Sequence, residues 1–159
     1  MQFRQRLLSS EGCSFDLDVA TDYGDELLEF SMHCQTDSAG TVSFKFTYPE
    51  TLEGVTGKIH AEEGRFVFDD TVVVFDLLTD GLATPISAPW LLVRTLSGGY
   101  INAAGADGEL YLFQIDDSYA EEPLRLDIWL DKNDVPVAAD ILWNGRRVVA
   151  LTIKNFQFL

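Results

Sequence analysis

Alternation of apolar and polar residues recurs along most of this chain and constrains its fold more than any other feature. Apolar side chains occupy every second position over residues 13–19 and again over residues 28–35. A period of two predicts strands with one buried and one exposed face. The same pattern, or a short apolar run bounded by turn residues, predicts further strands at 42–48, 55–61, 66–68, 71–75, 110–115, 124–131, 135–143 and 147–158. The chain therefore has about ten strands.

The first two predicted strands meet at a turn over residues 22–25, whose glycine suits a positive φ. With the turn centred on Tyr23 and Gly24, Cys13 faces Cys34. The other predicted pairs are also apolar: Val19 with Leu28, Leu17 with Phe30, and Phe15 with Met32. A disulfide between facing cysteines is one interpretation. The other is two reduced thiols that pack in the core as small hydrophobic side chains.

One interior helix is expected over residues 87–97. Ser87 can cap it, Pro89 suits its first turn, and two glycines follow its last turn. Its apolar residues cover most of its circumference, so it should lie against an apolar surface. We expect Trp90 and Leu91 to pack on the concave side of the sheet, with the helix as a lid. A shorter helix is expected over residues 3–8.

Three points concern the remaining strands. Residues 71–75 are apolar at successive positions, which predicts a strand covered on both faces. The hairpin of 124–131 with 135–143 predicts the pairs Leu130–Val135, Ile128–Val137, Leu126–Ala139 and Leu124–Ile141. The dipeptide Asn144-Gly145 predicts a tight hairpin turn that turns Val148 and Ala150 inward. A loop longer by one residue would turn Val149 and Leu151 inward, and the pattern leaves both registers open.

The charge balance excludes several classes of function. Acidic residues number 26 and basic residues 11, which gives a formal net charge of −15. Nucleic-acid binding and a polybasic membrane-surface role both need clustered cations, so neither is expected. Apolar residues make up 47% of the chain, which is enough for a core and too many for a disordered acidic tail. No apolar stretch approaches the ~20 residues of a membrane-spanning helix.

Catalytic motifs are not evident. The sequence has no nucleophile elbow, phosphate-binding loop, HExxH pair or calcium loop, and its cysteines lack zinc-ligand spacing. His33 and His60 fall on polar strand faces, where a histidine is usually a solvated surface residue. We therefore predict a single domain over residues 1–159 that is not an enzyme and uses no metal or other cofactor.

Several segments carry a resemblance to a known fold. They are residues 48–54, the Gly81-Leu82 step before Pro85, residues 130–136 and residues 149–156. Together with long strands, a central helix carrying Pro-Trp-Leu-Leu and four further strands, they resemble the LolA-like lipoprotein-carrier fold, and most closely its relatives among Gram-positive lipoproteins. The resemblance implies an α+β domain, a curved antiparallel half-barrel of about ten strands with the central helix as lid. The carrier's functional arginine matches no position here, so no site residue is carried over.

The resemblance also implies a function and a location. It implies a non-enzymatic, extracytoplasmic domain that binds or carries a hydrophobic ligand, such as a lipid or an acyl chain. Family members carry a signal and a lipid-modified cysteine upstream, which implies a membrane-anchored lipoprotein whose signal has been removed. Residues 1–8 have basic residues without an apolar segment after them, so a cytoplasmic location stays open.

The candidate ligand site is the apolar face of the first three strands together with the helix. Its residues are Phe15, Leu17, Phe30, Met32, Phe44, Phe46, Trp90 and Leu91. The alternative is that these side chains form an ordinary filled core. The domain would then be a protein-interaction or envelope-sensing module whose acidic surface meets a basic protein partner.

Overall fold

The computed structural model describes residues 1–22, 27–60, 63–68, 71–76, 78–79, 82–83 and 85–159. Its helices are α1 (Gln2–Ser9) and α2 (Ala88–Gly98), with short 3₁₀ turns at Glu50–Leu52 and Pro85–Ser87. Its strands are β1 (Cys13–Asp22), β2 (Leu27–Thr36), β3 (Val42–Tyr48), β4 (Thr56–His60), β5 (Glu63–Phe68), β6 (Thr71–Asp76), β7 (Leu78–Thr79), β8 (Leu82–Ala83), β9 (Tyr100–Asp107), β10 (Leu110–Asp116), β11 (Arg125–Leu130), β12 (Pro136–Trp143) and β13 (Arg146–Phe158).

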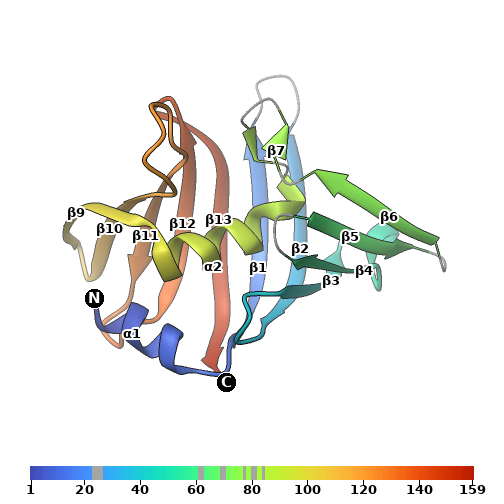
Figure 1. Cartoon of the computed structure of the whole chain (residues 1–159), viewed down its shortest axis with the longest axis horizontal. Helices are drawn as coiled ribbons and strands as arrows, with labels where there is room; N and C mark the ends of the chain where they lie inside the picture. The colour runs from blue at the N-terminus through green and yellow to red at the C-terminus, as the bar shows by residue number, and fades with distance from the viewer. Residues whose placement is uncertain (23–26, 61–62, 69–70, 77, 80–81, 84) are drawn as a thin grey trace.

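Eleven strands form one antiparallel sheet in the order β6-β5-β4-β3-β2-β1-β13-β12-β11-β10-β9, and β7 pairs with β8 separately. The sheet is open and curved, and α2 crosses one of its faces while α1 lies near the end of β13 (Figure 1). The predicted α+β architecture is therefore confirmed. Strand β9 was missed because Ala103, Ala104, Gly105 and Ala106 are too small to mark a buried face.

The central helix agrees with its prediction. Helix α2 spans Ala88–Gly98, with Ser87 before it, a proline in its first turn and Gly99 after it. Two carbonyl groups in the last turn of α2 accept hydrogen bonds from Arg4 of α1. Arg4 Nε donates to Leu96 O at 2.7 Å, and Nη2 donates to Thr95 O at 3.2 Å. A cation at this end complements the helix dipole and fixes the two helices together.

The register of the first hairpin differs from the prediction by two residues. Phe15 lies opposite Cys34, and Leu17 lies opposite Met32. Cys13 instead donates its backbone N–H to Thr36 Oγ1 at 2.9 Å. The predicted facing pair was therefore wrong, and both cysteines are buried and free in the structure. A shift of two keeps each side chain on its face, so the apolar pattern fits both registers. The turn predicted at 22–25 extends beyond the described residues.

The second predicted hairpin is displaced in the same way. Leu126 lies opposite Ile141 and Ile128 opposite Ala139, and a register shift between Trp129 and Leu130 follows. The predicted pairs were therefore wrong. The predicted buried face was right for β11, Ala139 and Ile141, but beyond the register shift Pro136 is buried in place of Val135 and Val137. The turn after β11 is held by the carboxylate of Asp131, which accepts from the N–H of Asn133 and of Val135.

The last hairpin combines both registers that the sequence left open. Trp143 pairs with Arg146, so the turn at Asn144-Gly145 has two residues, both at positive φ. An irregularity between Ile141 and Leu142 then shifts the register. Its consequence is that Val149, Leu151 and Ile153 are buried inside, and Val148 is buried as well. A β-bulge thus supplies the extra residue that a longer loop would have supplied.

Strand β6 corrects a further prediction. It lies at the end of the sheet order, and Val72 keeps 59% of its surface exposed. The expectation of cover on both faces was therefore wrong at this residue. A run of β-branched residues favours a strand whether it is central or at an edge, so it does not report what covers it.

Candidate functional site

The predicted ligand-site residues all lie in the hydrophobic core between the concave face of the sheet and α2. Each is at most 7% exposed, and they belong to one cluster: Phe15, Leu17, Phe30, Met32, Phe44, Phe46, Trp90 and Leu91. The ring of Phe46 lies 5.6 Å from that of Phe30 and 5.7 Å from that of Phe44. The sequence therefore identified a set of side chains that the fold brings together, and the structure shows them packed against one another.

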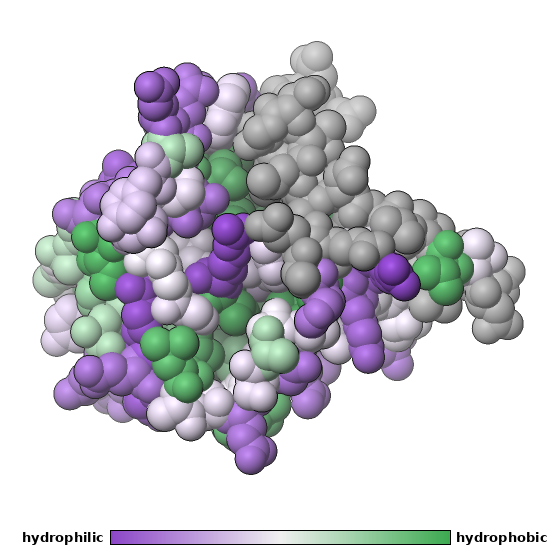
Figure 2. All heavy atoms as spheres, in the orientation of Figure 1, coloured by the Kyte–Doolittle hydropathy of each residue, from purple (hydrophilic) through white to green (hydrophobic). Residues whose placement is uncertain are grey.

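A groove opens beside α2, on the same side of the sheet. Its volume is about 420 Å³, and Figure 2 shows hydrophobic residues among hydrophilic ones on this side of the molecule. Trp90, Val93, Arg94 and Ser97 of α2 line it together with residues 39–40. The Arg94 guanidinium lies 4.8 Å from the centre of the Trp90 ring, so a cation borders the apolar side chains that line the groove.

A second hollow of about 250 Å³ continues this groove toward α1. The two share Ala39, Gly40, Val93 and Ser97, and the second adds Leu7 and Leu8 of α1. Leu8 is 65% exposed. We call the two hollows together the α2 groove. Sequence reasoning missed it because its walls come from three distant segments. The only signal was Leu8, an apolar residue on the outer side of a short predicted helix.

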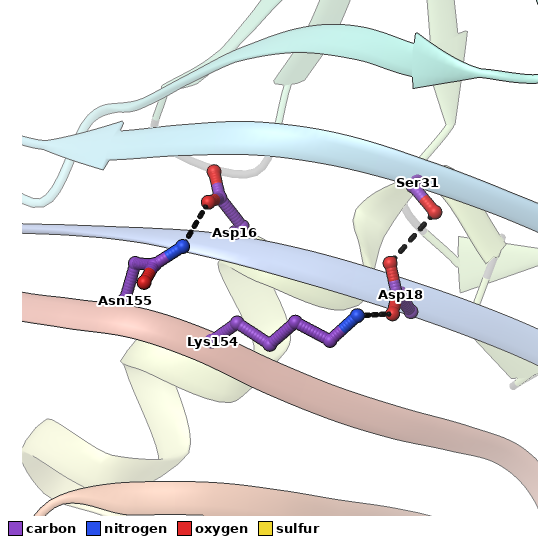
Figure 3. A network of polar contacts seen from close by, with 5 residues as sticks. All are labelled: Asp16, Asp18, Ser31, Lys154 and Asn155. Carbon is purple, nitrogen blue, oxygen red and sulfur yellow. Dashed lines mark hydrogen bonds and ion pairs between the residues drawn. The ribbon is translucent and has the colours of Figure 1, made fainter.

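The opposite face of β13, β1 and β2 carries a polar network (Figure 3). Lys154 Nζ donates to Asp18 Oδ2 at 2.6 Å, and Ser31 Oγ donates to Asp18 Oδ1 at 2.7 Å. Asn155 Nδ2 donates to Asp16 Oδ2 at 2.8 Å. Hydrogen bonds from Lys154 and Ser31 lower the pKa of Asp18, and those with Asn155 and His33 lower the pKa of Asp16. These contacts link three central strands on the face away from α2.

The remaining candidate groups for chemistry are dispersed. His33 Nδ1 lies 2.7 Å from Asp16 Oδ1, and His60 Nδ1 lies 2.8 Å from Thr41 Oγ1. Burial raises the pKa of both the Cys13 and the Cys34 thiols, which disfavours the nucleophilic thiolate. Among the described residues, no group of three or more His, Cys, Asp or Glu side chains is placed to hold a metal ion. Within the same residues, no helix has the length and apolarity to cross a membrane.

Known structures share this arrangement of strands and helices. No protein-family model and no curated protein matches the sequence. An uncharacterized conserved protein from Thermus thermophilus is similar with a TM-score of 0.55 and 12% identity, over 99% of this chain and 86% of that one. A DUF1329 family protein from Desulfovibrio piger is similar with a TM-score of 0.54 and 8% identity, over 98% and 88%. A LolA superfamily protein from Nitrosomonas europaea gives 0.49 and 8%, over 99% and 92%.

These similarities concern the fold, because the sequences are at most 12% identical. The chain shares the fold of the Thermus thermophilus and Desulfovibrio piger proteins, and in this chain that fold is one curved antiparallel sheet with a helix across its concave face.

Proposed function

We propose that this domain is a non-enzymatic binding or carrier protein for a hydrophobic ligand, such as a lipid or an acyl chain. The ligand binds between the concave face of the sheet and α2. The residues that contact it are those of the candidate site: Phe15, Leu17, Phe30, Met32, Phe44, Phe46, Trp90 and Leu91.

The observation that carries this proposal is the position of Trp90. This side chain belongs to the buried core and also lines the α2 groove, so it connects the two. An acyl chain that enters the groove along Leu8 and Val93 meets the indole next and then the aromatic and methionine side chains of the sheet. A flexible methionine such as Met32 can adapt its shape to a chain that displaces the helix from part of the core.

The first experiment is native mass spectrometry of the freshly purified protein, followed by organic extraction and lipid analysis. We expect one acyl-chain species at a near one-to-one ratio, or its uptake after incubation with a long-chain fatty acid. A bare mass before and after incubation rejects the proposal.

Two variants test the entrance. Leu8→Glu places a charge on an exposed wall of the groove, and Ser97→Trp fills its centre. Both should reduce fatty-acid uptake while the protein stays folded. Leu27→Glu is the matched control, because Leu27 is 81% exposed and lies on β2, outside the α2 groove. Equal uptake by all three variants and the parent chain would show that the ligand does not enter here.

We also propose that the domain works outside the cytoplasm as part of a membrane-anchored lipoprotein. The resemblance to lipoprotein carriers supports this location. Fractionation of the source cells should recover the protein with membranes and release it with detergent. Recovery in the cytosolic fraction would contradict it.

A second candidate function is an interaction with a basic protein partner, favoured by the exposed edge of the sheet. Every residue of β9 is exposed, and among the described strands it pairs only with β10. Asp107, Glu109 and Asp116 stand at its ends. An extended lysine-rich segment could add to this edge as a further strand. Hydrogen exchange with a lysine-rich peptide should then protect the β9 backbone, and unchanged exchange would exclude this mode.

A further inference from the structure

A groove of about 510 Å³ lies on the outer face of strands β2 to β6, away from α2. We call it the convex groove. The residues that line it include His33, Ser43, Lys45, Thr56, Lys58, Arg65 and Val72. It therefore gathers three permanent cations in a chain whose formal net charge is −15.

The strand register explains why these cations meet. Lys45 of β3 lies opposite His33 of β2 and Thr56 of β4. Lys58 of β4 lies opposite Ser43 of β3 and Arg65 of β5. The two lysines and Arg65 thus come from three adjacent strands and share one face of the sheet. Neighbouring strands are about 4.8 Å apart and two residues along a strand span about 6.6 Å, so the Cα atoms of the three residues lie within roughly 12 Å of one another.

The charges of the two lysines are not neutralised locally. Elsewhere in the chain the excess of carboxylates supplies partners, as Asp18 does for Lys154 and Asp140 for Arg147. Within the described parts of the chain, no carboxylate lies within ion-pair distance of Lys45 or Lys58.

The strand register also places Asp18, Glu63 and Asp76 on the face of these lysines, and the acid nearest to Lys45 along its row is Asp16. It stands beyond His33, which contacts it at 2.7 Å, and it also accepts a hydrogen bond from Asn155. His33 therefore separates Asp16 from Lys45 along the row. Among the described residues that line the convex groove there is no carboxylate, and the ammonium groups of Lys45 and Lys58 give it local positive charge on an acidic protein.

The groove also offers apolar surface. Val72 is 59% exposed at its β6 end. The aliphatic stems of Lys45 and Lys58 add to this surface while their ammonium groups reach the solvent. A site that combines cations with apolar surface should bind an oxyanion that carries an apolar group more tightly than it binds a free inorganic ion.

We propose that the convex groove binds a ligand with a phosphate-type oxyanion, which Lys45, Lys58 and Arg65 contact together. The site is separate from the ligand site under α2 and does not depend on it. The oxyanion belongs either to the headgroup of an anionic lipid or to a soluble phosphate compound. Either source uses the same three cations.

The experiment measures two kinds of binding with the intact chain. Calorimetry with pyrophosphate tests a soluble source, and sedimentation with phosphatidylcholine vesicles, with and without phosphatidylglycerol, tests a lipid source. We expect binding in at least one arm, and binding should weaken as salt is added because exposed charges are screened. Binding to phosphatidylglycerol vesicles alone identifies a lipid headgroup. The absence of binding in both arms overturns the proposal.

A double variant tests the residues. Lys45→Ala with Lys58→Ala should weaken binding roughly thirty-fold, since a lysine near an anionic surface contributes a factor of about five. The matched control is Lys132→Ala with Arg146→Ala, which removes two charges at exposed turns far from the groove. Equal affinity of the two double variants would show that the convex groove is not the site. Because Leu8→Glu changes only the α2 groove, it should leave this binding unchanged.

Discussion

Gly12 joins α1 to β1, and its replacement by alanine should destabilise the domain strongly. Its φ is +143°, a conformation that side chains rarely adopt. An alanine Cβ would lie 2.0 Å from the carbonyl oxygen of Thr36, a backbone atom of β2. The backbone strain costs about 1–3 kcal/mol. The overlap costs roughly a further 1–3 kcal/mol, because the end of β2 must move.

Together these effects predict a loss of about 2–6 kcal/mol in the free energy of unfolding. For a domain of 159 residues, each 1 kcal/mol lowers the melting temperature by roughly 2–4 °C. The replacement should also weaken the contact between the end of the chain and the residue before β1, because Leu159 donates its N–H to the Gly12 carbonyl at 2.9 Å.

Urea and thermal unfolding of three variants separate the two causes. Gly40→Ala is the control for backbone strain alone, because Gly40 has a φ of +81° and nothing within 4 Å of the added Cβ. It should cost about 1–2 kcal/mol. Gly98→Ala, in the last turn of α2 with open space around it, should be neutral or stabilise by about 0.5–1 kcal/mol. If Gly12→Ala costs no more than Gly40→Ala, the close approach of Gly12 to Thr36 is not present in solution.

Three further predictions follow from burial and charge. Burial raises the pKa of the Cys13 and Cys34 thiols, so neither should react with a thiol reagent at neutral pH until the protein unfolds; rapid labelling of the folded protein would contradict this. The pKa values of Asp16 and Asp18 are lowered in the folded state, so their stabilisation is complete above the unfolded value near pH 4 and is lost as the pH falls through the lower folded values. Replacing both with asparagine should flatten the acid side of a stability–pH profile, and an unchanged slope would refute their role. Leu92→Ala, at a fully buried position of α2, should cost about 2–5 kcal/mol in chemical unfolding, and a cost below 1 kcal/mol would show that α2 is not packed on the core.

The candidate site was partly predictable. The apolar residues of the first three strands and of the central helix follow from periods of two and of 3.6, and these periods mark a buried face whatever the register. The cations Lys45 and Lys58 also stood on polar faces of predicted strands. The net charge of the chain gave no sign that they form a cationic group, because a sum over all residues carries no information about which charges share a face.

The sequence by itself determined which residues of the first three strands and of α2 face inward, and where most elements begin and end. The ends of α2 are set by local backbone preferences at Ser87, Pro89 and Gly99. Strand β3 ends before Pro49, because a proline cannot donate a hydrogen bond to a strand ladder. Such local signals act within a few residues, so they survive without knowledge of the rest of the fold.

Only the tertiary structure decided which residue lies opposite which. The first hairpin moved by two residues, which placed Phe15 rather than Cys13 opposite Cys34. The last hairpin kept its tight turn and still brought Val149 to the core, because a bulge near Ile141 restored the inward face. Strand pairing with period two leaves registers two residues apart nearly equal in local terms. The choice between them is made by packing across the whole sheet and against α2.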